Sequence, residues 1–99
     1  MKKNTITKEK IDQIMASADF DAAVAHEKCV VVMCKLENGF VITESSACVD
    51  PANFDLETGL VICKKRIEDK LWELEGYALQ KELWEKSQKK AKKAKKAEA

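Results

Sequence analysis

A continuous apolar seam in the second half of the chain constrains the fold most. From Leu56 onward, apolar residues recur at intervals of three and four, which is the spacing of one face of an α-helix. Asp55 is a suitable N-cap, and Glu57 in the first turn complements the helix dipole. We therefore predict a long helix that starts near Leu56 and buries this face. The seam consists of Leu60, Cys63, Ile67, Leu71, Leu74 and Ala78.

The same segment carries more large apolar residues than one small domain needs to cover its own core. A surplus of this kind is typical of helices that also contact a partner chain, so we predict a homo-oligomer, a dimer or higher. Gly76 costs about 1 kcal/mol in a helix interior relative to Ala, which indicates a close approach at that point. The interface candidates are Trp72, Leu79, Leu83 and Trp84.

A β-hairpin precedes this helix. Residues 29–36 are rich in β-branched side chains and predict a strand, and residues 40–43 predict its return. A two-residue Asn38-Gly39 loop would place charged residues opposite large apolar ones. A three-residue loop over 37–39, with Gly39 left-handed, avoids this and is our prediction. The core face then consists of Val32, Cys34, Leu36, Phe40 and Ile42.

The remaining segments are short. Thr7 is a suitable N-cap for a short amphipathic helix that carries Ile11 and Ile14. We interpret the residues between this helix and Cys29 as a connection anchored by Phe20 and Val24, with a helical turn over 21–23 as one option. Residues 50–55 surround the single proline and predict a shaped loop, with Asp50 capping a helical turn. The predicted fold class is α+β: a short N-terminal helix, an antiparallel β-hairpin, and a long C-terminal helix packed on the hairpin, all in one domain over 1–85.

Charge divides the chain into two parts. Residues 86–99 contain seven lysines and one glutamate, whereas residues 1–85 contain 11 basic and 16 acidic residues, a net charge of −5. The Lys/Ala-rich tail has good helix propensity but no large apolar residue to bury, so we predict a frayed helix or a disordered segment. Such a tail provides either solubility or weak, non-specific affinity for nucleic acid. The nucleic-acid candidates are Lys89, Lys90, Lys92, Lys93, Lys95 and Lys96.

No catalytic, metal or cofactor motif emerges from the sequence. The four cysteines include no Cys-x-x-Cys pair, and we expect them to be reduced and mostly buried. His26 is the only histidine, and the three glycines are too far apart for a phosphate-binding loop. We therefore predict that the protein is not an enzyme and uses no metal or cofactor.

One surface is a candidate for binding a small anion. Lys65 and Arg66 follow the loop that holds Asn53 and Phe54, and cationic side chains beside a loop suit a nucleotide-like ligand. The alternative is an ordinary solvated helix face, with Asn53 capping local backbone.

The longest uninterrupted apolar run has six residues, so the sequence predicts no membrane-spanning helix. The basic start is not followed by the apolar core of a signal peptide, and we expect an intracellular protein.

Several strings in the middle of the chain resemble a small phage protein family, the one named for gene 49 of phage N4 and gene 66 of phage Sf6. The resemblance covers residues 29 to 83 and rests on Asn38-Gly39-Phe40, Ser46-Ala47-Cys48-Val49-Asp50-Pro51-Ala52-Asn53-Phe54-Asp55, Glu57-Thr58-Gly59 and Leu71-Trp72-Glu73-Leu74-Glu75-Gly76-Tyr77-Ala78-Leu79. It implies a phage or prophage product in the bacterial cytoplasm, with no assigned reaction.

Two hypotheses for function follow. The first is a non-enzymatic accessory protein that binds a host protein or a small anionic molecule, with counter-defence as one such role. The second is a nucleic-acid-associated protein that uses the basic tail and the helix face from Lys64 to Lys70.

Overall fold

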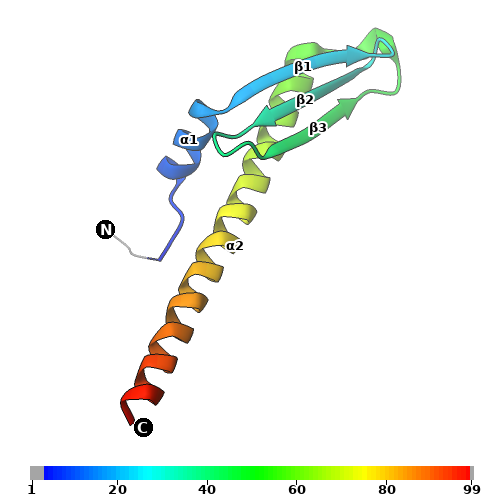
Figure 1. Ribbon diagram of the computed structural model, residues 1–99. Helices are drawn as coiled ribbons and strands as arrows, with labels where there is room; N and C mark the ends of the chain where they lie inside the picture. Colours follow the sequence, from blue (N-terminus) through cyan, green and yellow to red (C-terminus); the bar gives the residue numbers. More distant parts are fainter. Residues whose placement is uncertain (1–3, 99) are drawn as a thin grey trace.

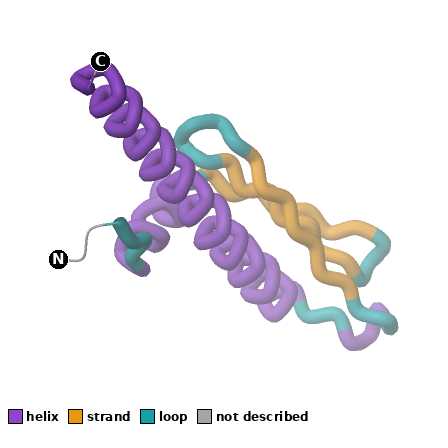
Figure 2. Tube along the Cα trace, turned by 90° about the horizontal axis from the view of Figure 1, so that it is seen from below, coloured by secondary structure: helices purple, strands orange, loops and turns teal. Residues whose placement is uncertain are grey.

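The protein consists of a small antiparallel sheet laid across the first part of a long helix (Figure 1). The computed structural model describes residues 4–98, and side chains for residues 4–93. The elements are α1 (Lys8–Ser17), β1 (Asp19–Ala25), β2 (Cys29–Lys35), β3 (Val41–Ala47), a 3-10 turn η1 (Pro51–Asn53) and α2 (Leu56–Glu98). The strands are ordered β1-β2-β3, and α2 covers one face of the sheet, chiefly beneath β2 and β3 (Figure 2). The predicted α+β class is confirmed, and so is the packing of the long helix on the strands.

The sheet has three strands, so the interpretation of residues 19–25 as a connection is wrong. β1 pairs with β2 along all seven of its residues, from Asp19 opposite Lys35 to Ala25 opposite Cys29. Alanine has low strand propensity, and the turn that follows contains no glycine. His26 and Glu27 nevertheless adopt positive φ angles of 53° and 61° there. Pairing with β2 therefore imposes a conformation that the local sequence does not favour.

The β2–β3 turn has the predicted three-residue loop. Leu36 donates its N–H to the Phe40 carbonyl (2.8 Å) and accepts from the Gly39 N–H (2.9 Å). Gly39 has φ +92°, and the Asn38 side-chain oxygen accepts from the Phe40 N–H at 3.0 Å. β3 continues to Ala47, four residues beyond the predicted end of the strand, because it pairs with all of β2.

The core lies between the sheet and α2 and is almost entirely apolar. Most of the predicted core face is buried, but Phe40 is 52% exposed, so its assignment to the core is wrong. Phe40 directly follows the turn of the hairpin, just before the first residue of β3, and there about half of its surface stays open to solvent. The fully buried residues are Ile11, Val30, Val32, Cys34, Ile42, Cys63, Ile67 and Leu71.

Predicted caps begin each helical segment. Thr7 caps α1 and Asp50 caps η1 through their side-chain oxygens. Asp55 accepts hydrogen bonds from the Glu57 N–H (3.1 Å) and the Thr58 hydroxyl (2.9 Å) at the start of α2. These hydrogen bonds lower the pKa of the Asp55 carboxyl. The bonds from Thr58 contribute most to the shift, and the bond from Glu57 contributes less.

A close backbone approach occurs at Gly59 and not at Gly76. A methyl group added at Gly59 would lie 2.7 Å from a γ-carbon of Val30, whose side chain is fully buried. At Gly76 the same methyl group would meet nothing within 4 Å among the described residues. The sheet therefore packs against the helix backbone one turn after α2 begins.

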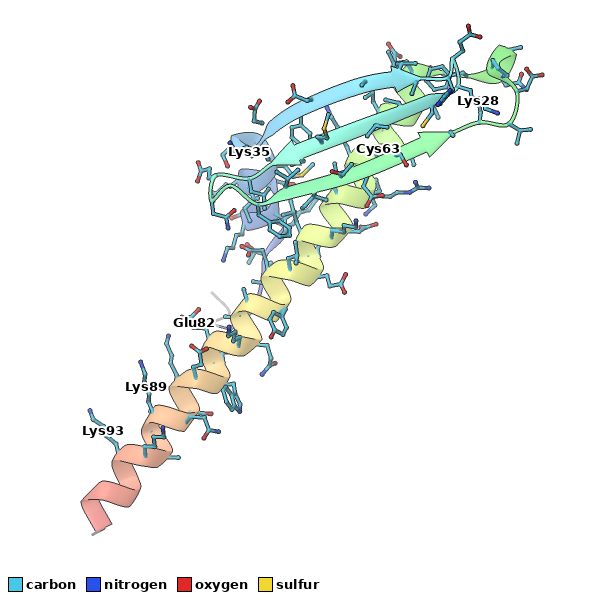
Figure 3. All side chains as sticks on the ribbon, turned by 45° about the vertical axis from the view of Figure 1, so that its right-hand side comes forward. Lys28, Lys35, Cys63, Glu82, Lys89 and Lys93 are labelled. Atoms are coloured by element: carbon cyan, nitrogen blue, oxygen red, sulfur yellow. The ribbon has the colours of Figure 1, made fainter. Side chains whose placement is uncertain are left out.

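Beyond the sheet, α2 continues as a single projecting helix, and the molecule measures 73 × 26 × 22 Å. Residues 86–98 continue α2, and the fraying predicted for this end remains a prediction. Lys89 and Lys93 extend into solvent from the projecting part (Figure 3). The side chains of Lys95 and Lys96 lie outside the described residues. Within residues 4–98, no helix has a stretch apolar and long enough to cross a bilayer.

Candidate binding groove

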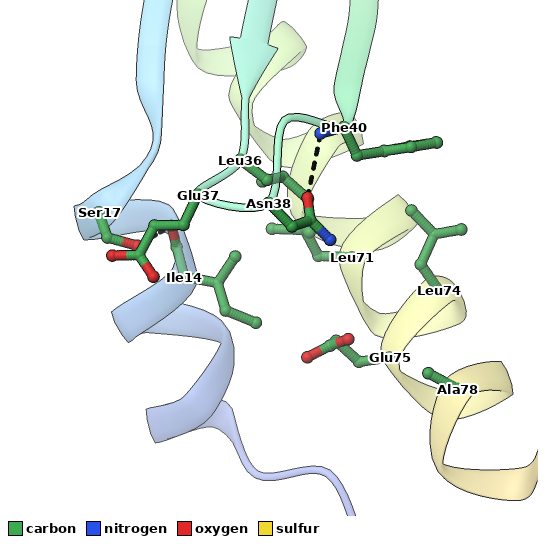
Figure 4. A pocket seen from close by; sticks show the side chains of 10 residues that line it. All are labelled: Ile14, Ser17, Leu36, Glu37, Asn38, Phe40, Leu71, Leu74, Glu75 and Ala78. Carbon is green, nitrogen blue, oxygen red and sulfur yellow. Dashed lines mark hydrogen bonds between the residues drawn. The ribbon is translucent and has the colours of Figure 1, made fainter. Parts of the chain in front are cut away.

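An apolar groove of about 380 Å³ opens where α1, the β2–β3 turn and α2 meet (Figure 4). Leu71 is buried at its base, while Phe40 (52% exposed) and Leu74 (39% exposed) present apolar surface to solvent. The apolar lining consists of Ile14, Leu36, Phe40, Leu71, Leu74 and Ala78.

The polar residues at this groove are mainly acidic. Glu37 enters from the β2–β3 turn and Glu75 from α2, and Figure 4 shows both carboxylates at the groove. Glu75 pairs with Lys10 of α1 at 3.6 Å. The Ser17 hydroxyl donates to the Ile14 carbonyl (3.1 Å) and so bonds within its own helix. The groove therefore combines an apolar floor with two carboxylates.

A second hollow of about 300 Å³ adjoins the first. Phe40 and Leu74 line both, so these two side chains form a ridge between them. The second hollow also contains Val41 from β3 and Lys70 and Glu73 from α2. Together the two hollows provide a continuous, mostly apolar surface at one end of the sheet.

The predicted anion-binding residues lie at the other end of the sheet. β3 separates the β2–β3 turn from the Asn53 loop, and seven residues of strand span about 23 Å. Asn53 is exposed at the end of η1. Phe54 is half-buried and packs against the core, which gives it a structural role.

Lys65 and Arg66 are already engaged by groups of the protein itself. Lys65 bonds to Asp69 at 2.7 Å, and this bond raises the pKa of the Lys65 ammonium group. Arg66 donates to the Ser45 carbonyl at 2.8 Å. Both residues lie more than two helical turns beyond Phe54, and none of the four candidates lines either hollow described above.

The predicted interface residues do not share one environment. Trp72 is half-buried against the core, whereas Leu79, Leu83 and Trp84 lie on the projecting part of α2. Trp84 is 59% exposed there.

The four cysteines are free, but two of them, Cys29 and Cys48, are only half-buried, so they are not mostly buried as predicted. Cys34 and Cys63 are buried, and burial raises the pKa of each thiol. Among the described residues, no group of three or more His, Cys, Asp or Glu side chains is arranged to hold a metal ion.

Sequence reasoning did not find the groove. Its lining comes from three separate segments, and each apolar member was predicted to serve the core or the helix seam. The only local signal is a carboxylate close to apolar residues, as in Glu37 beside Leu36, and this arrangement is common on protein surfaces.

Comparison with known proteins identifies the family. Residues 6–83 match the model of the phage protein (N4 Gp49/phage Sf6 gene 66) family. The comparisons with curated proteins and with solved structures gave no match. The matched region includes α1, all three strands and the part of α2 that packs on the sheet, and it ends before the lysine tail. Because this match covers most of the chain, the protein belongs to the phage protein family of N4 Gp49 and Sf6 gene 66.

Proposed function

We propose that this protein is a non-enzymatic phage accessory protein that binds a host protein in the bacterial cytoplasm. The groove is its binding site, and the ligand is an apolar segment of the partner flanked by basic residues. One observation carries the proposal: an apolar groove bearing the carboxylates of Glu37 and Glu75. A component of bacterial defence is one kind of partner that such binding would block.

Burial of apolar side chains supplies the affinity in this proposal. Phe40 and Leu74 expose apolar area that a bound segment would cover, and each Å² removed from water contributes about 25 cal/mol. The ridge of Phe40 and Leu74 has a hollow on either side, so two neighbouring side chains of the partner could bind at once.

Charge supplies the specificity. Residues 1–85 carry a net charge of −5, which attracts a basic segment and speeds its association. The ion pair between Glu75 and Lys10 is loose, with 3.6 Å between nitrogen and oxygen, and the Lys10 side chain is 54% exposed. A lysine or arginine of the partner can therefore share or replace that contact.

A small anionic ligand is less favoured by this geometry. The groove carboxylates would repel it, and Lys65 and Arg66 already bond to Asp69 and Ser45. A panel of cyclic and linear nucleotides tests this version directly, because binding would raise the melting temperature.

The test of the groove uses a synthetic amphipathic peptide with an apolar helical face and lysines at both ends. Addition to isotope-labelled protein is expected to shift the amide NMR signals of Leu36, Phe40 and Leu74. A peptide with the same apolar face and glutamates at its ends should bind less tightly. The change Leu74→Glu should abolish the shifts, while Val61→Glu, at a position 67% exposed and outside both hollows, should preserve them. Equal binding of both peptides, or shifts confined to other regions, would contradict the proposal.

The projecting lysines support a second candidate, association with nucleic acid. The observation that favours it is a helical tail with Lys89, Lys90, Lys92 and Lys93 exposed on it. Binding to an arbitrary DNA duplex should weaken steeply with added salt and disappear when the chain ends at Glu85. Affinity that is insensitive to salt, or unchanged by the truncation, would exclude this role.

A further inference from the structure

The two edges of the sheet differ in their contact with α2, which lies beneath β3 but not beneath β1. At the β3 edge, Arg66 of α2 donates to the Ser45 carbonyl at 2.8 Å, and Lys70 pairs with Glu44 at 2.6 Å. Among the described elements, only β2 pairs with β1 (Figure 1), and the Lys64 ammonium of α2 lies over the inner face of β1, 5.5 Å from the centre of the Phe20 ring. An uncovered strand edge presents backbone donors and acceptors that another strand can use.

The hydrogen bonds show which groups of β1 face outward. The Ala25 carbonyl accepts from Lys28 in the β1–β2 turn (3.3 Å), so it faces β2. Backbone groups alternate sides along a strand, so the N–H and C=O groups of Phe20, Ala22 and Val24 face away from β2. The hydrogen bonds of β2 on its β3 side are consistent with this assignment. Leu36 and Lys28, just outside the two ends of β2, bond to Phe40 and Cys48, which flank β3. The backbone groups of the even-numbered residues of β2 therefore face β3, and those of the odd-numbered residues face β1.

We propose that β1 pairs with β1 of a second copy of this chain, antiparallel, about a two-fold axis through Ala22. Phe20 then lies opposite Val24 of the second copy, and Ala22 lies opposite Ala22. These are the residues whose backbone groups face outward, so each such pair can exchange two hydrogen bonds. The product is a continuous six-stranded sheet with both α2 helices on the same face.

Side-chain chemistry supports this register. On the outer face, Asp19 and Asp21 come opposite Ala25 and Ala23 of the second copy, so no two carboxylates lie directly opposite one another. If the two-fold axis passed through Asp21 instead of Ala22, Asp21 would lie opposite Asp21 of the second copy. If it passed through Ala23, Asp19 and Phe20 would have no residue of the second β1 opposite them. On the inner face, Val24 is 51% exposed in the single chain and gains Phe20 as a direct cross-strand neighbour.

The dimer is independent of the proposed function. No residue of β1 lines either hollow described above, so two grooves stay open in the dimer. A seven-residue edge is a small interface, at the lower end of those that form specific complexes, so the dimer should be weak and should depend on concentration.

Sedimentation of the full-length chain over a roughly hundredfold range of concentration tests the association. We expect a shift from monomer to dimer in the unmodified protein. Ala22→Pro removes an N–H that faces outward and keeps every bond to β2, and Ala22→Asp places two carboxylates together at the axis. Both changes should abolish the dimer, and circular dichroism reports whether each variant still folds.

Cysteine cross-linking tests the register, in a background with Cys29→Ser and Cys48→Ser. Cα atoms of a hydrogen-bonded antiparallel pair lie about 5.5 Å apart, which is within the range for a disulfide. Ala22→Cys should therefore form a covalent dimer with a mild oxidant. Ala23→Cys is the matched control, because the two Ala23 positions lie diagonally at about 7–8 Å and should not cross-link. The proposal is overturned by a monomer at all concentrations, by a dimer that survives Ala22→Asp, or by equal cross-linking at 22 and 23.

Discussion

The two halves of α2 form one continuous helix, but different interactions stabilise them. Residues 56–78 pack an apolar face on the sheet and α1, and three of the fully buried core residues belong to this part: Cys63, Ile67 and Leu71. Residues 79–98 project from the body, and the side chains described there, over residues 79–93, gain no comparable burial. Their support is intrinsic propensity and local pairs such as Glu82 with Lys86 at 3.0 Å. The same secondary structure therefore depends on tertiary packing at one end and on local sequence at the other.

The strongest test of this difference truncates one buried and one projecting side chain. Ile67 is fully buried against the sheet, so Ile67→Ala should cost about 2–5 kcal/mol of unfolding free energy. Trp84→Ala, at an exposed position, should change it by about 0.5 kcal/mol or less. Guanidinium denaturation of both variants gives the comparison. Similar losses would show that the projecting half is packed against another surface.

The two glycines of α2 provide a second test, in which the same substitution has opposite signs. Gly59→Ala would force a methyl group against the stiff side chain of Val30, and we expect a loss of about 1–3 kcal/mol. Gly76→Ala meets open space among the described residues and should stabilise the protein by about 1 kcal/mol. Thermal unfolding at matched concentration measures both. A destabilising Gly76→Ala would indicate an unseen contact at that position.

Periodic burial explains what the sequence could predict. The seam that includes Cys63, Ile67 and Leu71 repeats with the period of a helix, so the packed half of α2 was evident. Asn38-Gly39 similarly identified one hairpin, because that dipeptide adopts the required turn readily.

β1 was missed because its evidence is not local. The turn before β2 uses His26 and Glu27 at positive φ, where asparagine or glycine is usual. The alanines of β1 have low strand propensity, so only the pairing of β1 with β2 defines the strand. The groove was missed for a related reason, since three separate segments must be placed in space before Phe40 and Leu74 are seen to share a surface with Glu75.

The packed end of α2 should also respond to pH, by a smaller amount than the glycine changes. Hydrogen bonds from Thr58 hold the pKa of Asp55 below its usual value of about 4. A carboxyl with a lowered folded-state pKa stabilises the fold above its unfolded-state pKa, and this contribution is lost as the pH falls through the folded-state pKa. Asp55→Asn retains a capping side chain that does not titrate, so the difference in stability between wild type and variant should shrink between about pH 5 and pH 2. A difference that stays constant over that range would contradict the assigned role of Asp55.

The smallest effect is expected from removing the tail. If the projecting half depends only on local propensity, ending the chain at Glu85 removes the helical signal of residues 86–98 but leaves the core intact. The unfolding free energy should then change by about 0.5 kcal/mol or less, because every side chain described there, over residues 86–93, is exposed. Circular dichroism measures the lost helix, and denaturation of the same samples measures stability. A large drop in stability with the truncated chain would mean that the lysine tail contacts the body, and the division of α2 into a packed and a self-supporting half would then fail.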